Sequence, residues 1–189
     1  CIYCNENAFS DLAGTKVPLR EQIETAIEGM KNSSGASRFM AYFQNATGTN
    51  AGVEGLRRAY DTVKAYPEIV AMSIATRPDC VDAEKLDLIS GYMPGLEVWI
   101  EYGLQSVHES SLKAIRRGHT HSQTVLAVEE SAARGIKVGV HVILGLPGES
   151  REDMVRTARE VSALPVSGVK LHILHVLKDT ELERMYLEG

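Results

Sequence analysis

The sequence predicts an α/β fold in which a parallel sheet is curved into a partial barrel. Strand patterns alternate with helical patterns along the whole chain, which is typical of parallel strands joined by right-handed crossovers. The strand segments are apolar on both faces, as parallel strands buried from both sides should be. Polar residues gather where these segments end, which is where parallel α/β folds carry their sites.

The first four elements lie in the first 75 positions. Apolar residues at helical spacing predict a helix over 19–31. The short, aromatic-rich segment 38–44 is typical of a strand. A second helical pattern covers 53–63, and Pro67 follows it, as expected after a helix end. The apolar segment 69–75 is the second predicted strand.

The next elements continue the alternation. A helix is predicted over 83–92, a strand over 97–102 and short helical turns over 109–117. The helix that follows, 123–133, is closed by Gly135, because glycine takes the left-handed conformation that is common just after a helix.

The last elements are a strand over 138–144, a helix over 151–164, a strand over 169–174 and a final helix marked by Leu182 and Tyr186. The sequence therefore predicts five strands. A closed barrel needs about eight. Five strands, or six with one upstream, are compatible with either an open barrel or a doubly wound sheet.

Composition excludes several classes of protein. The net charge of −5 gives no dense basic face of the kind that binds nucleic acid, although it does not exclude an RNA substrate that is bound mainly by parts missing from this chain. No apolar run approaches the ~18 residues of a membrane span. Three cysteines are an odd number and too few for a disulfide framework, so a reducing cytoplasm fits best. Because the chain begins at Cys1 rather than at Met, we expect it to be a piece of a longer protein.

Polar side chains follow each of the five predicted strands. One such loop would be ordinary, but five that deliver polar groups to one rim indicate a site, because such groups must find partners or water. In chain order these residues are Gln44, Asn45, Thr47, Thr49 and Asn50; Thr76, Arg77 and Asp79; Glu101, Gln105 and Ser106; Gly145 to Glu149; and His172 and His175.

Cys1 and Cys4 form a Cys-x-x-Cys pair, which alone is ambiguous. It is compatible with a redox pair, half of a zinc site or part of an iron–sulfur site. The redox reading is weakened because a polar loop follows the pair rather than a helix. Zinc needs four ligands, and Cys80 lies two strands away, where it reads as a small loop or core residue.

Two further motifs have both an ordinary and a functional interpretation. The glycines of the turn 145–149 either supply unusual backbone dihedrals or leave bare backbone that a flat ligand can approach. Arg116, Arg117 and His119 are either a solvated helix end or contain an arginine that clamps a carboxylate. The remaining histidines considered, which read as surface or core residues, are His108, His121 and His141.

Taken in order, these motifs resemble the radical S-adenosylmethionine (SAM) superfamily. Within it, the chain is most similar to a group of bacterial and archaeal Fe–S oxidoreductases of unassigned substrate, related to elongator-type tRNA-modifying radical SAM proteins. The resemblance covers essentially residues 1–189. The matching motifs are Cys1-Ile-Tyr-Cys4, Tyr42-Phe-Gln-Asn-Ala-Thr-Gly-Thr49, Ser73-Ile-Ala-Thr-Arg-Pro-Asp-Cys80, Glu101-Tyr-Gly-Leu-Gln-Ser106, Arg116-Arg-Gly-His119, Ile143-Leu-Gly-Leu-Pro-Gly-Glu149 and Lys170-Leu-His172 with His175.

The resemblance implies a partial (β/α)6 TIM-like barrel whose first strand lies upstream of this chain. It also implies a 4Fe–4S cluster held by three cysteines, with Cys1 and Cys4 as the second and third and the first expected upstream. An electron from the cluster would cleave SAM to methionine and a 5′-deoxyadenosyl radical that abstracts hydrogen from a substrate. An electron donor such as flavodoxin or ferredoxin, an unknown substrate (tRNA or a small molecule) and no membrane partner complete the expectation.

Individual roles carry over by position. Gln44, Asn45, Thr47 and Thr49 match the segment that meets the methionine amino group, and Arg77 adds a cofactor contact after the second strand. Glu101, Gln105 and Ser106 match the strand end that contacts the ribose and methionine. Arg117 is a candidate partner for the SAM carboxylate. The adenine side is expected at Gly145, Gly148 and His172.

Two other functions remain open from the sequence. One is a barrel that binds a nucleotide or RNA without a cluster. The other is a metal-independent hydrolase or isomerase in which Glu101 and His172 serve as the acid and base.

Overall fold

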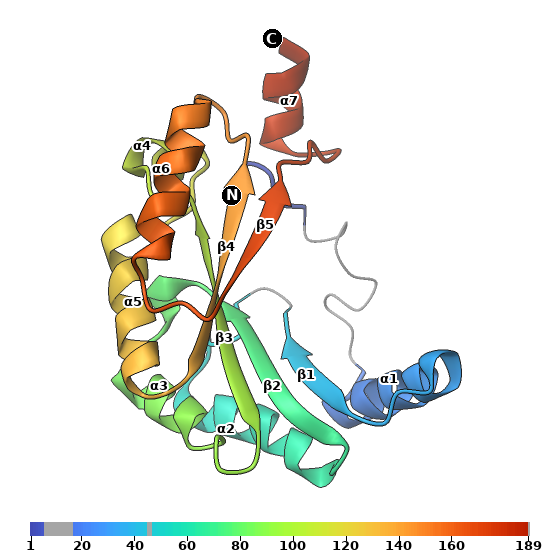
Figure 1. Cartoon of the computed structure of the whole chain (residues 1–189). Coiled ribbons are helices and arrows are strands. Elements are labelled where there is room, and N and C mark those ends of the chain that lie inside the picture. Colours follow the sequence, from blue (N-terminus) through green and yellow to red (C-terminus); the bar gives the residue numbers. More distant parts are fainter. Residues whose placement is uncertain (6–16, 45–46, 189) are drawn as a thin grey trace.

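The computed structural model describes residues 1–5, 17–44 and 47–188 of the 189-residue chain (Figure 1). Its centre is one sheet of five parallel strands in the sequential order β1-β2-β3-β4-β5. The predicted parallel sheet is thus confirmed. The strands are β1 (Phe39–Phe43), β2 (Ile69–Thr76), β3 (Glu97–Gln105), β4 (Lys137–Leu144) and β5 (Gly168–Ile173).

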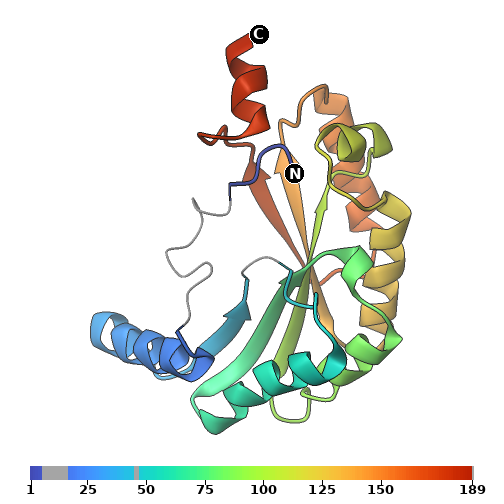
Figure 2. The ribbon, with the colours of Figure 1, turned by 180° about the vertical axis from the view of Figure 1, so that it is seen from behind.

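The sheet is curled into a half-barrel with helices on its outer side. Figures 1 and 2 show α2, α3, α5 and α6 covering the same face of the sheet, so the doubly wound alternative is wrong. The helices are α1 (Leu19–Ser34), α2 (Val53–Asp61), α3 (Ala83–Ser90), α4 (Glu109–Ala114), α5 (His121–Ala133), α6 (Arg151–Ser162) and α7 (Glu181–Glu188), with short 3-10 turns η2 (Thr62–Ala65) and η3 (Pro78–Cys80).

Side-chain caps set where two of the helices begin. Thr120 Oγ1 accepts a hydrogen bond from the backbone N–H of Gln123, whose side chain accepts one from the N–H of Thr120. This reciprocal capping box satisfies two otherwise unpaired donors, so α5 begins at His121, two residues before the predicted start. Ser150 and Asp153 form the same arrangement at the start of α6.

The predicted end of the third strand at Tyr102 is wrong, because β3 continues to Gln105. The register between β3 and β4 shifts between Tyr102 and Gln105, and Gln105 has a left-handed backbone with φ of 69°. Such a bulge carries the strand beyond the point where its polar sequence suggests an end. Glu101 therefore lies within the half-barrel and not at its rim.

The main core lies between the outer face of the sheet and the helices. On β3, Val98, Ile100 and Tyr102 alternate outward and are almost completely buried, and the Tyr102 hydroxyl lies 2.8 Å from Ser131 Oγ on α5. The residues between them face the inside of the half-barrel. A second, smaller apolar cluster at the carboxyl end of β4 consists of Ile2, Leu112, Ile115, Ile143, Leu146 and Leu182.

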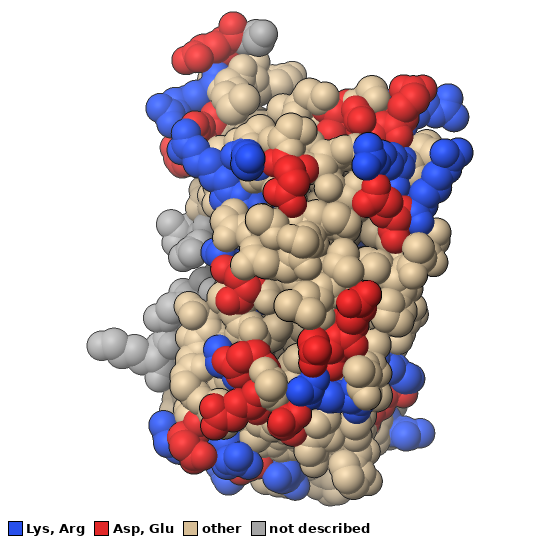
Figure 3. All heavy atoms as spheres, turned by 90° about the vertical axis from the view of Figure 1, so that its left-hand side faces the viewer, with Lys and Arg blue, Asp and Glu red and all other residues tan. Residues whose placement is uncertain are grey.

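The helix-covered side carries charges of both signs in alternation, with no large patch of either sign (Figure 3). Arg134, for example, pairs with both Asp87 and Glu130 at 2.7 Å. Within the described ranges, none of the helices combines the length and the apolar character needed to cross a membrane.

Candidate active site

The rim of the half-barrel is shaped by the end of β3. Gln105 adopts a left-handed backbone, which is uncommon for a residue other than glycine and often marks a functional position. Its side-chain Oε1 is buried and has no hydrogen-bond partner among the described residues. A buried amide oxygen without a partner costs free energy, so this position is suited to receive a donor from a bound molecule.

Arg117 lies beside this strand end and is half-buried. Its Nε donates to the carbonyl of Gly103 at 3.1 Å, and a side chain on Gly103 would collide with the guanidinium. No carboxylate in the described part of the chain pairs with Arg117, and burial lowers its pKa. A partly desolvated cation without a counter-ion is destabilising, which favours an anion at this position.

The neighbouring Arg116 has a different environment. Its backbone is left-handed, with φ of 51°, and its guanidinium is exposed. It forms a two-pronged ion pair with Glu181 at 2.5 and 2.6 Å. The two adjacent arginines therefore point to different partners, and only Arg117 faces the rim.

Cys1 and Cys4 lie in a turn that is fixed to the same rim. The N–H of Cys4 donates to the carbonyl of Cys1 at 3.3 Å, and both thiols are exposed. The backbone of Ile2 bonds to Ile115 and Leu182 at 3.2 and 2.9 Å, and its side chain is buried in the smaller apolar cluster. Arg117 Nη1 donates to Cys1 Sγ at 3.8 Å.

These two thiols do not complete a metal site by themselves. No group of three or more His, Cys, Asp or Glu side chains that could hold a metal ion occurs among residues 1–5, 17–44 and 47–188. Cys80 is held elsewhere, because its carbonyl accepts from Thr49 at 2.8 Å and from Lys85 at 3.1 Å. Burial raises the pKa of its thiol, as expected for an inert loop cysteine.

The glycine turn after β4 faces open space. Gly145 and Gly148 both have φ of 82°, and a Cβ on either would meet nothing within 4 Å. Their left-handed backbone conformation therefore favours glycine. Neighbouring atoms would not exclude a larger side chain at either position. Ser106, which is fully buried, ties this turn to β3 by donating to Glu149 Oε1 at 2.5 Å.

Several predicted site residues already have partners inside the protein. Thr49 is fully buried and bonds to the Thr76 hydroxyl at 2.6 Å, and Arg77 pairs with Asp79 at 2.6 Å. Gln44 is exposed at the end of β1 and Thr47 is half-buried. Asn45 lies outside the described residues. As cofactor contacts these positions remain predictions.

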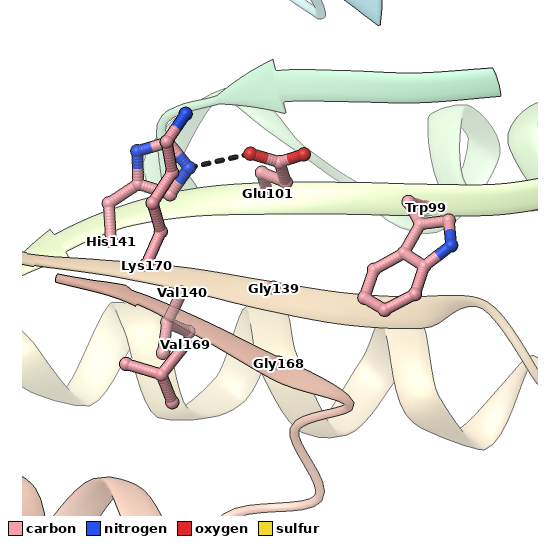
Figure 4. Close-up of a pocket in the computed structure, with 8 residues that line it drawn as sticks. All are labelled: Trp99, Glu101, Gly139, Val140, His141, Gly168, Val169 and Lys170. Carbon is pink, nitrogen blue, oxygen red and sulfur yellow. Dashed lines mark hydrogen bonds and ion pairs between the residues drawn. The ribbon is translucent and has the colours of Figure 1, made fainter. Parts of the chain in front are cut away.

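Inside the half-barrel, Glu101 is the centre of a hydrogen-bonded network. Its carboxylate accepts from His141 Nε2 and Ser73 Oγ, both at 2.6 Å, and from the Tyr42 hydroxyl at 2.8 Å. Figure 4 shows the His141 ring pointing at the Glu101 carboxylate. The bond from His141, followed by those from Ser73 and Tyr42, outweighs burial and lowers the pKa of Glu101 to about 2.

His172 lies next to this network without replacing His141 in it. The two imidazole rings are 5.2 Å apart between centroids. Burial, followed by the charges of His141 and Lys170, lowers the pKa of His172. The partner of Glu101 is thus His141, which the sequence assigned to the core or surface. Its position on the same face as Glu101 follows from strand register, for which the sequence carries no local signal.

Replacing Glu101 with glutamine should lower the free energy of unfolding by about 1–3 kcal/mol near pH 6, because buried Ser73, half-buried His141 and exposed Tyr42 all lose an ionised acceptor. The lowered pKa means that this stabilisation is fully present above the ordinary value of 4.5 and is lost as the pH falls through about 2. The gap between wild type and variant should therefore narrow by about 1 kcal/mol between pH 6 and pH 3.5 in urea unfolding.

The matched control is Glu97→Gln on the same strand, whose exposed carboxylate pairs with Lys137 at 2.9 Å. It should leave stability almost unchanged at both pH values. A gap between wild type and Glu101→Gln that is equal at pH 6 and pH 3.5 would show that the network does not hold an ionised Glu101.

Comparison with known proteins identifies the family to which this chain belongs. A sequence model described as "Radical SAM superfamily" matches residues 1–161. An uncharacterized protein of Methanocaldococcus jannaschii, MJ0486, is 42% identical over the whole chain, which spans 60% of that protein. A tRNA uridine(34) acetyltransferase of Methanocaldococcus infernus is 32% identical over 64% of the chain and 22% of its own length.

The fold is shared with a solved structure. The archaeal Elp3 of Methanocaldococcus infernus, with its N-terminus deleted, superposes with a TM-score of 0.77 and 24% identity, over 90% of this chain and 45% of that one. This likeness concerns the fold alone. The chain thus spans about three-fifths of the length of MJ0486. It spans smaller shares of the acetyltransferase and of the Elp3 structure.

Proposed function

Because the chain belongs to the radical SAM superfamily, we propose that it forms most of the catalytic core of an enzyme that cleaves SAM reductively. The main support for this proposal is that two independent features lie together at one rim of the half-barrel. The exposed pair Cys1 and Cys4 lies beside Arg117, a half-buried cation without a carboxylate partner in the described part of the chain. The two thiols could hold a metal cluster, and the arginine could bind an anionic ligand at the same place.

The donor set fits part of a 4Fe–4S cluster. Soft thiolates are the ligands that such clusters take, and both thiols are exposed at the turn. We assign Cys1 and Cys4 as two of the three cysteine ligands of such a cluster. When bound, the cluster supplies the electron that cleaves SAM to methionine and a 5′-deoxyadenosyl radical.

The residues of the rim would bind and orient SAM. Arg117 suits its carboxylate, because a guanidinium binds a carboxylate through two parallel hydrogen bonds. The unpartnered Oε1 of Gln105 suits a hydroxyl or amino donor. The bare turn from Gly145 to Gly148 leaves room for the flat adenine. The protein's contribution is to hold SAM in place and to exclude water around it.

The substrate is proposed only by class. The relative named tRNA uridine(34) acetyltransferase makes an RNA-related substrate the favoured choice. A small electron carrier such as flavodoxin or ferredoxin would reduce the cluster. We place the reaction in the reducing cytoplasm, where exposed thiols remain unoxidised.

Replacing Arg117 with alanine should weaken SAM binding about 10- to 100-fold, the loss expected when a charge-assisted hydrogen-bond pair is removed from a buried anion. Calorimetry on reconstituted full-length protein of matched iron content measures this. Arg116→Ala is the control, since it removes the same charge from the adjacent residue, which pairs with Glu181 at the surface. Equal losses in both variants would mean that Arg117 acts only through general electrostatics, and unchanged affinity in both would place SAM elsewhere.

A further inference from the structure

His119 lies beside Arg117 at the rim and is almost completely buried, with 6% of its surface exposed. Its Nε2 is 3.0 Å from the carbonyl oxygen of Gly103. The same oxygen accepts a hydrogen bond from Arg117 Nε at 3.1 Å. Two side chains that are two positions apart in the sequence therefore lie on one acceptor of β3.

The shared acceptor belongs to the bulge at the end of β3. Gly103 lies between Tyr102 and Gln105, where the register against β4 shifts, and a bulge of this kind interrupts the regular ladder. A side chain on Gly103 would collide with the Arg117 guanidinium and with the Gln105 amide. The backbone at this bulge therefore determines where both of these side chains can lie.

The His119 ring carries its proton on Nε2. Burial, followed by the charge of Arg117, lowers the pKa of His119, so the ring is neutral at pH 7 and has one N–H. Nδ1 lies 3.2 Å from the carbonyl of the adjacent Thr120 and 3.5 Å from the hydroxyl of Thr124, which can donate to it. A proton on Nδ1 would set the bare Nε2 lone pair against the Gly103 oxygen. With the proton on Nε2, His119 donates to that oxygen.

Fixing the Gly103 carbonyl restricts how the Arg117 guanidinium can lie. The bond from Nε to this carbonyl leaves the terminal nitrogens Nη1 and Nη2 for a ligand, and Nη1 lies 3.8 Å from Cys1 Sγ. Paired hydrogen bonds to a carboxylate require one orientation of the guanidinium. A side chain that is already held in that orientation loses less conformational entropy on binding. The contact from His119 to Gly103 therefore prepares Arg117 for an anion.

We propose that His119 is a positioning residue for SAM: it fixes the Gly103 carbonyl, and thereby the Arg117 guanidinium, in the orientation that receives the SAM carboxylate. The inference rests on the proposed function, because it adds the group that orients the arginine assigned there. In this role His119 does not touch SAM. Its effect on SAM binding therefore depends on Arg117 and on the carboxylate, and a merely structural role would depend on neither.

Calorimetry with SAM on reconstituted full-length protein of matched iron content tests this role. His119→Ala should weaken SAM binding about tenfold, the loss of roughly one charge-assisted hydrogen bond. His119→Gln should retain most of the affinity, because its amide nitrogen reaches the place of Nε2, whereas the shorter side chain of His119→Asn should not. His121→Ala is the matched control and should bind SAM like the wild type, since His121 lies two positions away and faces Glu160 at 3.2 Å.

Two further measurements separate positioning from general stability. Decarboxylated SAM should bind equally well to the wild type and to His119→Ala, because it lacks the group that Arg117 receives. In an Arg117→Ala background, His119→Ala should cause no further loss of SAM affinity, since the two residues act as one unit.

Equal losses with SAM and with decarboxylated SAM, additive losses in the double variant, or equal affinities of His119→Gln and His119→Asn would overturn the inference. The last comparison stands even if His119→Ala does not fold. A loss of affinity in Arg117→Ala without one in His119→Ala overturns this inference alone. An Arg117→Ala variant that binds SAM like the wild type would overturn both this inference and the carboxylate contact of the proposed function.

Discussion

Replacing Cys4 with alanine should remove nearly all iron from the anaerobically purified full-length protein, and Cys1→Ala should do the same. A 4Fe–4S cluster of this kind is held by thiolates, with about four irons per chain expected in the wild type. Losing one of three thiolates leaves too few bonds to retain it. Both thiols are exposed at the rim, and the turn that carries them is anchored by Ile2, so neither substitution disturbs the core.

Cys80→Ala is the matched control for these variants. Its thiol is half-buried in a loop fixed by Thr49 and Lys85 through the backbone, and burial raises its pKa. Iron content should therefore equal that of the wild type. Iron retained in both Cys1→Ala and Cys4→Ala, or lost in Cys80→Ala, would contradict the assignment of the ligands.

Most of the fold was predictable because its signals are local. Helical spacing, β-branched or aromatic runs and glycine or proline at helix ends placed all five strands, and every strand was found in sequential parallel order. The errors arose at positions where tertiary structure, and not local sequence, sets the backbone conformation. β3 extends to Gln105 through a register shift and a left-handed backbone, which no propensity indicates.

That extension changes where Glu101 lies along the strand. With the strand ending at Tyr102, Glu101 would lie at the rim; with the strand continuing to Gln105, it faces the interior and bonds to His141. The partner comes from another strand, 40 residues away. Pairings of this kind depend on register and strand order, so sequence reasoning assigned His141 to the core or surface.

The adjacent arginines show that a sequence pattern does not predict which of two neighbouring side chains faces the rim. Arg116 and Arg117 are equivalent in charge and differ by one position, yet one pairs with Glu181 and the other is half-buried against Gly103. The left-handed backbone of Arg116 separates them. Of the two interpretations of the glycine turn, unusual backbone dihedrals are confirmed, since Gly145 and Gly148 both have positive φ, and the approach of a flat ligand stays a prediction.

The largest functional effect concerns the products formed from SAM. Reconstituted full-length protein reduced with dithionite should release 5′-deoxyadenosine and methionine even without its substrate, because cleavage requires only the cluster, the SAM contacts and an electron. The rate should be slow, since an open rim admits water. Under the same conditions Cys4→Ala should form neither product.

Chromatographic analysis of SAM products, on wild type and Cys4→Ala side by side, therefore decides whether this protein cleaves SAM reductively. We expect 5′-deoxyadenosine from the wild type alone. S-adenosylhomocysteine as the product would indicate methyl transfer instead. No product at all from protein with a complete and reducible cluster would contradict the account and favour a barrel that binds a nucleotide or RNA without SAM chemistry.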